Sequence, residues 1–309
     1  MSDARPPVAD ILARSGGGPR RLRELLAGGE LVLAPGVYDA LGVRLVQEAG
    51  FAAVYMTGFG TAASRLGRPD VGLVTMSERV DNASRIVRAT SLPVIADADT
   101  GYGKPINVIR TVQEYERAGV AGIHIEDQVS PKKCGHMEGK QVIPAADMVA
   151  KVRAAVAARQ SEDFILIART DAGAVEGIRA AIERARRYHD AGADLLFVEA
   201  ATSEEEIETV AGELSDVPLL FNWAEGGKTP PVAYDRLREL GFRIVIFPIS
   251  TLLSATQAMR HALAEIRRAG TPIPILDRLL PFGEFLDFIG LPEIRKLELR
   301  FTSEEVNPT

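Results

Sequence analysis

Two aspartates separated by one residue end an apolar run and could share a metal ion. In the run VIADAD, alternation along a β-strand places the carboxylates of Asp97 and Asp99 on one face. Two buried carboxylates repel each other and lose hydration unless a cation lies between them. Mg2+ is the simplest such cation because it prefers oxygen ligands. The alternative is helix capping, which would explain Asp99 but leave Asp97 buried without a partner, so we favour the metal.

Later apolar runs also end in polar side chains. In the run GIHIE, His124 and Glu126 share one side of a strand, and Glu126 is the better metal ligand. A histidine on a strand is more often a hydrogen-bonded core residue, so we expect His124 to orient its neighbours. Further runs end in Arg169, Glu199 and Asn222. An arginine beside carboxylates forms either a structural ion pair or a two-point contact with a substrate carboxylate.

The segment PKKCGHMEGK, residues 131–140, is rich in reactive side chains and poor in apolar ones. This composition is typical of a mobile loop over a barrel mouth. Cys134 is flanked by Lys132, Lys133 and His136, and such electropositive surroundings lower a thiol pKa. A lone cysteine is usually an inert buried residue, but the charged neighbours argue against that here. We therefore expect Cys134 to act as an acid or a base.

Eight short apolar runs alternate with amphipathic segments and must position these groups. The predicted strands are 31–35, 52–58, 93–99, 122–128, 164–170, 195–200, 218–223 and 242–248. The predicted helices are 38–49, 77–90, 106–118, 145–159, 174–191, 203–214, 231–240 and 251–268, with Ser77 and Ser203 as N-caps of the second and sixth. The pattern predicts an α/β fold, a (β/α)8 TIM barrel with its catalytic face at the C-terminal ends of the strands. A doubly wound sheet is the alternative, but no G-x-G-x-x-G loop follows the first strand.

Three parts are expected along the chain. Residues 1–20 form a flexible N-terminal segment, residues 21–270 the barrel catalytic domain, and residues 271–309 a C-terminal helical extension. The extension contains the aromatic stretch FGEFLDFI from Phe282 and a second helix from Glu293. So much apolar surface needs a partner, either its own barrel or another subunit, and the sequence favours neither.

Composition excludes several classes of protein. With 46% apolar and 25% charged residues, a chain of 309 residues can bury a large core. The net charge of −6 argues against nucleic-acid and anionic-membrane partners. Cys134 is the single cysteine, so no intrachain disulfide forms and we expect a cytoplasmic location. No stretch approaches the roughly 20 apolar residues of a membrane span.

Three motifs, DADTGYG from Asp97, IEDQ from Ile125 and KKCGH from Lys132, together resemble the isocitrate lyase and phosphoenolpyruvate mutase superfamily. The resemblance covers residues 22–301 and rests on the combination, because each motif alone is unspecific. It implies a barrel enzyme that depends on Mg2+, with Mn2+ as the alternative ion. It also implies a homotetramer, a dimer of dimers that exchange the last barrel helix. The resemblance is strongest to the 2,3-dimethylmalate lyase, oxaloacetate hydrolase and methylisocitrate lyase-like branch.

The resemblance assigns roles position by position. The residues at the metal would be Asp97 and Asp99, with Asp70 and Glu126 acting partly through metal-bound water. The residues that bind or orient substrate would be Tyr55, Thr57, Gly58, Gly135, His136, Arg169, Glu199 and Asn222. The catalytic residues would be Cys134, Lys132, His136, Tyr55 and Arg169. Among these, Cys134 would protonate the departing enolate.

The implied reaction is a retro-aldol or retro-Claisen cleavage of a small 2-hydroxy dicarboxylate, such as 2,3-dimethylmalate or a 2-alkylmalate, to pyruvate or a similar 2-oxo acid and a carboxylate. The general base stays open among Tyr55, His136 and Glu225. The cysteine of KKCGH is typical of the lyases, whereas phosphonate mutases typically lack it. From Ile249 the chain reads ISTLL, where relatives that cleave tricarboxylates are expected to carry an additional arginine.

Four alternatives remain at this point. Three are enzymes of the same superfamily: a methylisocitrate lyase, an oxaloacetate hydrolase or decarboxylase, and a phosphonomutase or phosphonopyruvate hydrolase. The fourth is a non-catalytic binding barrel, which we disfavour because the motif positions keep side chains able to do the chemistry.

Overall fold

The computed structural model describes residues 17–135 and 137–302. The chain separates into two compact units, residues 15–252 and, among the described residues, 253–302. Helix α11 (Ser250–Ala269) begins in the first unit and continues in the second. Residues 1–16, part of the segment expected to be flexible, lie outside the described residues. The domain boundaries expected at residues 20 and 270 stay a prediction.

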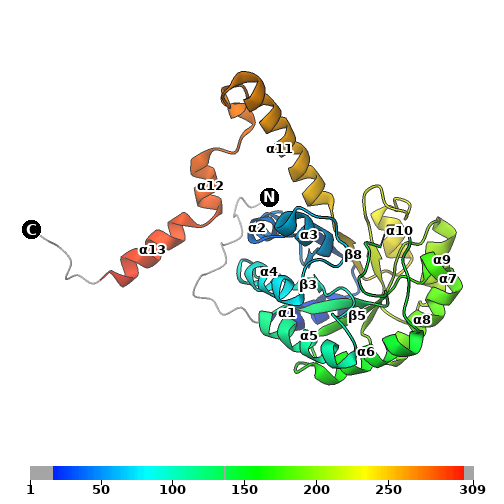
Figure 1. Cartoon of the computed structure of the whole chain (residues 1–309). Helices are drawn as coiled ribbons and strands as arrows, with labels where there is room; N and C mark the ends of the chain where they lie inside the picture. Colours follow the sequence, from blue (N-terminus) through cyan, green and yellow to red (C-terminus); the bar gives the residue numbers. More distant parts are fainter. Residues whose placement is uncertain (1–16, 136, 303–309) are drawn as a thin grey trace, which may run out of the picture. The chain divides into compact units, whose positions relative to one another are not determined.

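Eight parallel strands form the first unit's barrel, enclosed by helices (Figure 1). The strands are β1 (Val32–Val37), β2 (Val54–Met56), β3 (Val94–Asp97), β4 (Gly122–Glu126), β5 (Ile165–Thr170), β6 (Leu195–Val198), β7 (Leu220–Asn222) and β8 (Ile244–Phe247). They pair in the order β6-β5-β4-β3-β2-β1-β8-β7, and a bridge between Leu196 and Leu219 joins the two ends of this order. The predicted (β/α)8 barrel is therefore confirmed, and each predicted run overlaps one strand.

Helices follow the strands as predicted, with three differences. The matching helices are α2 (Ala40–Glu48), α4 (Met76–Arg88), α5 (Pro105–Ala118), α6 (Ala145–Ala158), α8 (Ile178–Asp190), α9 (Glu204–Glu213), α10 (Tyr234–Glu239) and α11. Two helices were not predicted, α1 (Gly18–Ala27) and α3 (Gly58–Leu66). The helix expected over 174–191 is divided into α7 (Gly173–Glu176) and α8, because Gly177 between them has a φ of 91°.

Helix starts show why one predicted cap was wrong. The sequence predicts Ser77 as the cap of α4, but Thr75 caps it. The Glu78 N–H donates to the Thr75 side chain, and the Glu78 carboxylate accepts from the Thr75 N–H at 2.8 Å. This reciprocal pair requires a spacing of three residues, which Thr75 offers to Glu78 and Ser77 does not. Ser203 caps α9 as predicted.

Alternation along the strands separates two apolar layers. Outward side chains such as Ile123 pack against the helices, and inward ones such as Ile95 and Phe197 fill the barrel. Leu22 of α1 belongs to the inner layer, and Gly18 lies against Ala121 at the start of β4. Helix α1 therefore covers the N-terminal end of the barrel with apolar side chains. The predicted site residues at the strand ends lie at the opposite, C-terminal end.

The second unit consists of helices with much exposed apolar surface. After α11 come the 3-10 turn η1 (Ile273–Arg278), α12 (Phe282–Phe288) and α13 (Leu291–Phe301). The exposed side chains are large: Phe282 is 75% exposed and Leu299 is 79% exposed. The helices predicted in the extension are thus present, and their exchange between subunits stays a prediction. None of the described helices combines the length and apolar character needed to cross a membrane.

Candidate active site

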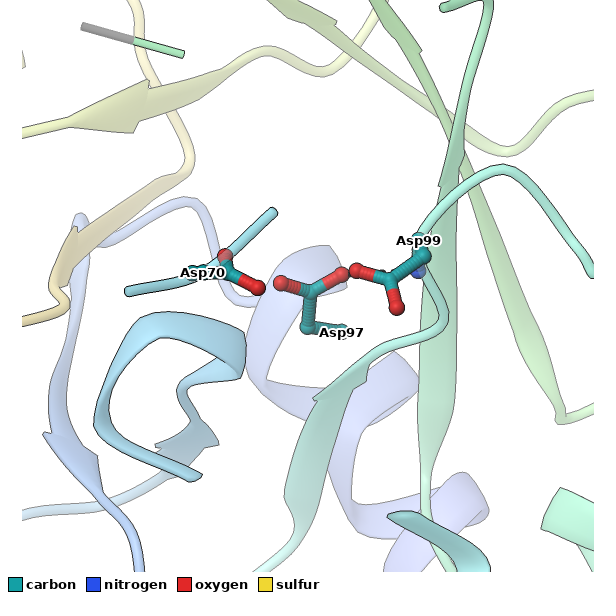
Figure 2. A group of neighbouring side chains, drawn as sticks. All are labelled: Asp70, Asp97 and Asp99. Carbon is teal, nitrogen blue, oxygen red and sulfur yellow. Dashed lines mark hydrogen bonds between the residues drawn. The ribbon is translucent and has the colours of Figure 1, made fainter. Parts of the chain in front are cut away.

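Three buried carboxylates converge at the C-terminal end of β3 (Figure 2). Asp97 ends the strand, Asp99 follows it, and Asp70 comes from the segment between α3 and α4; one oxygen of each lies within 4.8 Å of the others. Strand alternation does not bring Asp99 here as predicted, because β3 ends at Asp97 and Asp99 has a φ of 47°. A left-handed turn, closed by the Asp99 N–H donating to Asp97 Oδ1 at 2.8 Å, directs the carboxylate.

Two buried cations lie against the carboxylates. Arg79 Nη2 is 3.1 Å from Asp70 Oδ1 and 3.0 Å from Asp99 Oδ2. Lys132 Nζ donates to Asp70 and lies 2.9 Å from Asp99 Oδ1. Burial alone would lower the pKa of both cations, but the carboxylates, Asp99 foremost, raise it well above its usual value. Both side chains therefore stay charged.

The carboxylates are not fully compensated by these two cations. Burial raises the pKa of Asp99 and raises that of Glu126 well above its usual value. Burial acts in the same direction on Asp97, but surrounding basic groups hold its pKa below the usual range. Glu126 Oε1 is buried and has no hydrogen-bond partner among the described residues. A further cation fits this excess of buried oxygen, and hard oxygen ligands suit Mg2+ or Mn2+.

Glu126 does not join the aspartate group itself. The three carboxylates close enough to share one ion among the described residues are those of Asp70, Asp97 and Asp99. Glu126 faces the barrel interior from β4, where Arg169 Nε lies 3.3 Å from its Oε2. This placement suits the expected action through water better than direct binding.

His124 shares the inner side of β4 with Glu126, as the alternation predicts. Its Nε2 is 2.8 Å from Tyr55 Oη and 3.7 Å from Asp97 Oδ1. Burial lowers the pKa of His124 to about 4, so the imidazole is neutral near pH 7. Burial also raises the pKa of Tyr55 well above 10, so its hydroxyl keeps the proton. Tyr55 is therefore a hydrogen-bonding group here and a poor general base.

A cavity of about 210 Å³ opens beside the carboxylates. The predicted residues that line it are Tyr55, Thr57, Gly58, Asp70, Asp97, Lys132, Cys134, Gly135, Arg169, Glu199, Asn222 and the candidate base Glu225. Asp99 and Glu126 are not among the lining residues, but Asp99 contacts Lys132 and Glu126 contacts Arg169, and both of these cations line the cavity. His136 lies outside the described residues. The structure thus brings most of the predicted site to one cavity.

Arg169 is held by carboxylates and also lines the cavity. Its guanidinium lies 2.9 Å from Asp171 Oδ2 and 3.2 Å from Glu199 Oε2. The Asn222 amide donates to Glu199 Oε2 at 3.1 Å. The ion-pair alternative from the sequence is therefore present, and it fixes the guanidinium in place without removing it from the cavity.

Several site residues were missed from the sequence. Arg79 is fully buried on α4, on the same helix face as Ala83 and Ile86. An arginine at a core position of an amphipathic helix was the signal that could have found it.

Gly58 was predicted for substrate contact, but an added Cβ there would overlap Asp97 Oδ2, so the glycine also permits α3 to approach the carboxylates.

The cavity also has an apolar wall that sequence reasoning did not anticipate. It is formed by Phe59, Met137, Ala224, Ile246, Pro248 and Ile249. Phe59 lies in α3, Met137 in the loop after β4 and Ala224 after β7, whereas Ile246, Pro248 and Ile249 lie at the end of β8, so no single local pattern groups them.

Residues 22–267, most of the chain, match the phosphoenolpyruvate phosphomutase family. The chain belongs to this family. It is 46% identical over 283 residues to the 2,3-dimethylmalate lyase of Eubacterium barkeri, which covers 92% of this chain and 98% of that protein. It is 49% identical over 275 residues to a 2-methylisocitrate lyase of Aeropyrum pernix, and the match covers 89% of this chain and 88% of that protein. A crystal structure of 2,3-dimethylmalate lyase matches with a TM-score of 0.89 and 42% identity, covering 96% and 98%.

The predicted membership of the phosphoenolpyruvate mutase superfamily is thus confirmed. Both relatives are lyases by name, in agreement with the predicted enzyme class.

Replacing Arg79 by Met should strongly destabilise this family member in the absence of metal. The variant leaves Asp70 and Asp99 buried with one cation fewer, and removal of one partner from a buried ionic group costs about 3–5 kcal/mol. Urea unfolding in EDTA measures the loss. Arg85→Met on the same helix is the matched control: Arg85 pairs with Asp81 on the surface, and little change is expected. Equal stability of the two variants would contradict this account of the cluster.

Proposed function

We propose that the chain is a Mg2+-dependent carbon-carbon lyase. Its substrate would be a small 2-hydroxy dicarboxylate, of the 2,3-dimethylmalate or 2-alkylmalate type, and its products a 2-oxo acid such as pyruvate and a carboxylate. The observation that carries the proposal is one cavity lined by the Asp70 and Asp97 carboxylates, Arg169 and the Cys134 thiol. Similarity to two lyases over most of the chain supports it.

Asp70, Asp97 and Asp99 would hold the metal, with Glu126 bonded to its water. When bound, Mg2+ would supply positive charge to a substrate hydroxyl and its neighbouring carboxylate and so lower the hydroxyl pKa; Mn2+ is the alternative ion. The chain's own contribution is to keep these carboxylates together. Arg79 and Lys132 do this by contacting Asp70 and Asp99 at the same time.

The start of α3 would bind the 2-oxo acid part of the substrate. The Thr57 side chain accepts from the Gly60 N–H at 3.1 Å, whereas Gly58 and Phe59 occupy the first turn, where N–H groups have no acceptor within the helix. Thr57, Gly58 and Phe59 all line the cavity. A carboxylate at this helix start would meet donors and the positive end of the helix dipole.

Cys134 would complete the reaction by protonating carbon. When the bond between C2 and C3 breaks, its electron pair passes to the departing fragment as an enolate, and the thiol proton goes to the carbon of that fragment. Arg169, in the same cavity, would stabilise the negative charge before that transfer.

Glu225 is the general base that we favour among the three candidates. It lines the cavity; Oε1 accepts from the Ser250 hydroxyl, and Oε2 is buried without a hydrogen-bond partner among the described residues. Tyr55 is disfavoured by its raised pKa.

The apolar wall favours a substrate with an alkyl group over one with a third carboxylate. Among the described lining residues, Arg169 and Lys132 are the cations near the predicted site, and Lys132 already contacts Asp70 and Asp99. A third carboxylate beside Phe59 and Ile249 would lose hydration without gaining a cation. 2-Methylisocitrate cleavage remains the second candidate because of the similarity to a lyase of that name.

The C-terminal helices support assembly into a homotetramer with exchanged helices. Burying an exposed Phe or Leu side chain stabilises an interface by roughly 2 kcal/mol, and Phe282, Leu299 and Ile273 are all more than two-thirds exposed. A cytoplasmic location, inferred from the single cysteine, stays a prediction.

A panel of dicarboxylates tests the proposed reaction. With Mg2+, pyruvate or another 2-oxo acid should be released from 2,3-dimethylmalate or a 2-alkylmalate. EDTA should abolish the release, because the metal supplies the positive charge that stabilises the substrate alkoxide. 2-Methylisocitrate, oxaloacetate and phosphonopyruvate are the comparison substrates. Full turnover in EDTA would rule out the metal, and turnover of phosphonopyruvate alone would assign phosphonate chemistry instead.

Replacing Cys134 by Ser should slow the cleavage roughly 10²–10⁴-fold, because a hydroxyl is a much weaker acid than a thiol. Pyruvate binding, measured by calorimetry in Mg2+, should persist. Glu138→Gln, at an exposed position of the same loop that does not line the cavity, is the control and should keep near-normal turnover. Normal turnover by the serine variant would remove Cys134 as the acid.

Light scattering tests the assembly. The intact chain should have the mass of four chains, and Phe282→Asp combined with Leu299→Asp should reduce it, since each charge would be buried at the interface. Ile106→Asp replaces a side chain that is 77% exposed on the barrel and should leave the mass unchanged. A monomeric intact chain would overturn the proposed tetramer.

A further inference from the structure

The segment between β4 and α6 carries Cys134 and is tied at its base. Gln128 and Val142 form an antiparallel bridge across the two ends of the segment. The Gln128 side chain also contacts the backbone of Lys133, accepting from its N–H at 2.9 Å and donating to its carbonyl at 2.8 Å. These contacts hold the segment up to the residue before Cys134.

The residue after Cys134 is held from the other side of the loop by Lys140. Lys140 Nζ donates to the Gly135 carbonyl at 2.5 Å and to Asp171 Oδ1 at 2.8 Å. The Lys140 side chain is 2% exposed, and that of Asp171 is fully buried. Burying an ammonium group is costly unless each contact is specific, so this lysine is not a solvated loop side chain.

Asp171 connects the loop to the cavity arginine. It accepts from Arg169 Nε at 2.9 Å and Nη2 at 3.1 Å while it binds Lys140, and its N–H donates to Asp127 Oδ1 at 2.9 Å. Burial alone would raise the pKa of Asp171, but Arg169 and Lys140 hold it below the usual range. A continuous set of contacts thus runs from Gly135 through Lys140 and Asp171 to Arg169.

Gly135 lies directly against the Arg169–Glu199 ion pair. A Cβ on this residue would lie 2.5 Å from Arg169 Nη2 and 2.6 Å from Glu199 Oε2, so the loop backbone rests directly on that ion pair. Cys134, Gly135 and Arg169 line the cavity, whereas Lys140 and Asp171 do not. Lys140 therefore acts on the cavity only through its contacts with Gly135 and Asp171.

We propose that Lys140 is a positioning residue that holds Gly135 against the Arg169–Glu199 pair and so directs the Cys134 thiol into the cavity. The consequence for turnover rests on the proposed lyase function. The consequence for the position of the thiol does not, because it follows from contacts within the chain.

The experiment compares Lys140→Met with Lys133→Met in the full-length protein. Methionine keeps much of the side-chain volume of Lys140 but removes its charge and both hydrogen bonds. Lys133, in the same loop, bonds the Gly139 carbonyl at 2.8 Å on the surface and serves as the matched control. Lys140→Arg, which keeps charge and donors, is the conservative variant.

Alkylation of Cys134 by iodoacetamide is the readout independent of activity, because the chain has one cysteine. The rate is followed with pH to its alkaline plateau, where thiol ionisation no longer limits it. Lys140→Met should change the plateau rate about tenfold, and Lys140→Arg should restore much of the difference. Lys133→Met should stay near the wild-type rate. Wild-type plateau rates for Lys140→Met would overturn the proposal.

Turnover provides the second readout. On the substrate found by the dicarboxylate panel, Lys140→Met should lower kcat roughly 100-fold with a smaller change in KM, because a displaced acid affects the chemical step more than binding. Equal loss in the Lys133→Met control would contradict a specific role for Lys140. If no dicarboxylate is cleaved, the proposed function fails while the alkylation rates still decide the role of Lys140. Should Lys140→Met not fold, Lys140→Gln takes its place in both measurements with the same expected changes.

Discussion

The burial of Asp70, Asp97 and Asp99 at one end of the barrel is the constraint on which the rest of the site depends. Carboxylates removed from water must be neutralised nearby. Helix α4 supplies the fully buried Arg79, and the loop after β4 supplies Lys132. The electrostatic requirement that brings Lys132 to the carboxylates therefore also brings the Cys134 loop to them.

A second set of charges repeats this arrangement beside the first. Arg169 contacts Glu126, Asp171 and Glu199, and Asp171 also binds Lys140 of the loop. The loop is thus attached to the barrel by Lys132 at one side and by Lys140 at the other. Between these attachments lie Cys134 and Gly135, which line the cavity. The position of the Cys134 loop therefore depends on the charges of the site, because both of its attachments are ion pairs.

Much of the fold and the site could be predicted, for reasons that differ between elements. Long amphipathic helices and apolar strands carry their period in the sequence, so the barrel and the inner placement of His124 and Glu126 followed from alternation. Helix α3 was missed because its nine residues begin within a predicted strand run, at Gly58. Arg79 was missed, although it lies on the apolar face of α4, because its buried partners Asp70 and Asp99 lie elsewhere in the chain.

By itself, the sequence determined the order of strands and helices, the single cysteine and the types of side chain at the strand ends, because these depend on local period and identity. Only the tertiary structure decided that Asp99 reaches Asp70 through a left-handed turn and that Lys140 bonds Gly135 and Asp171. It also decided that Tyr55 keeps its proton. These outcomes depend on burial and on contacts between residues far apart in the chain, and the free energy of a buried charge is set by neighbours that no local pattern contains.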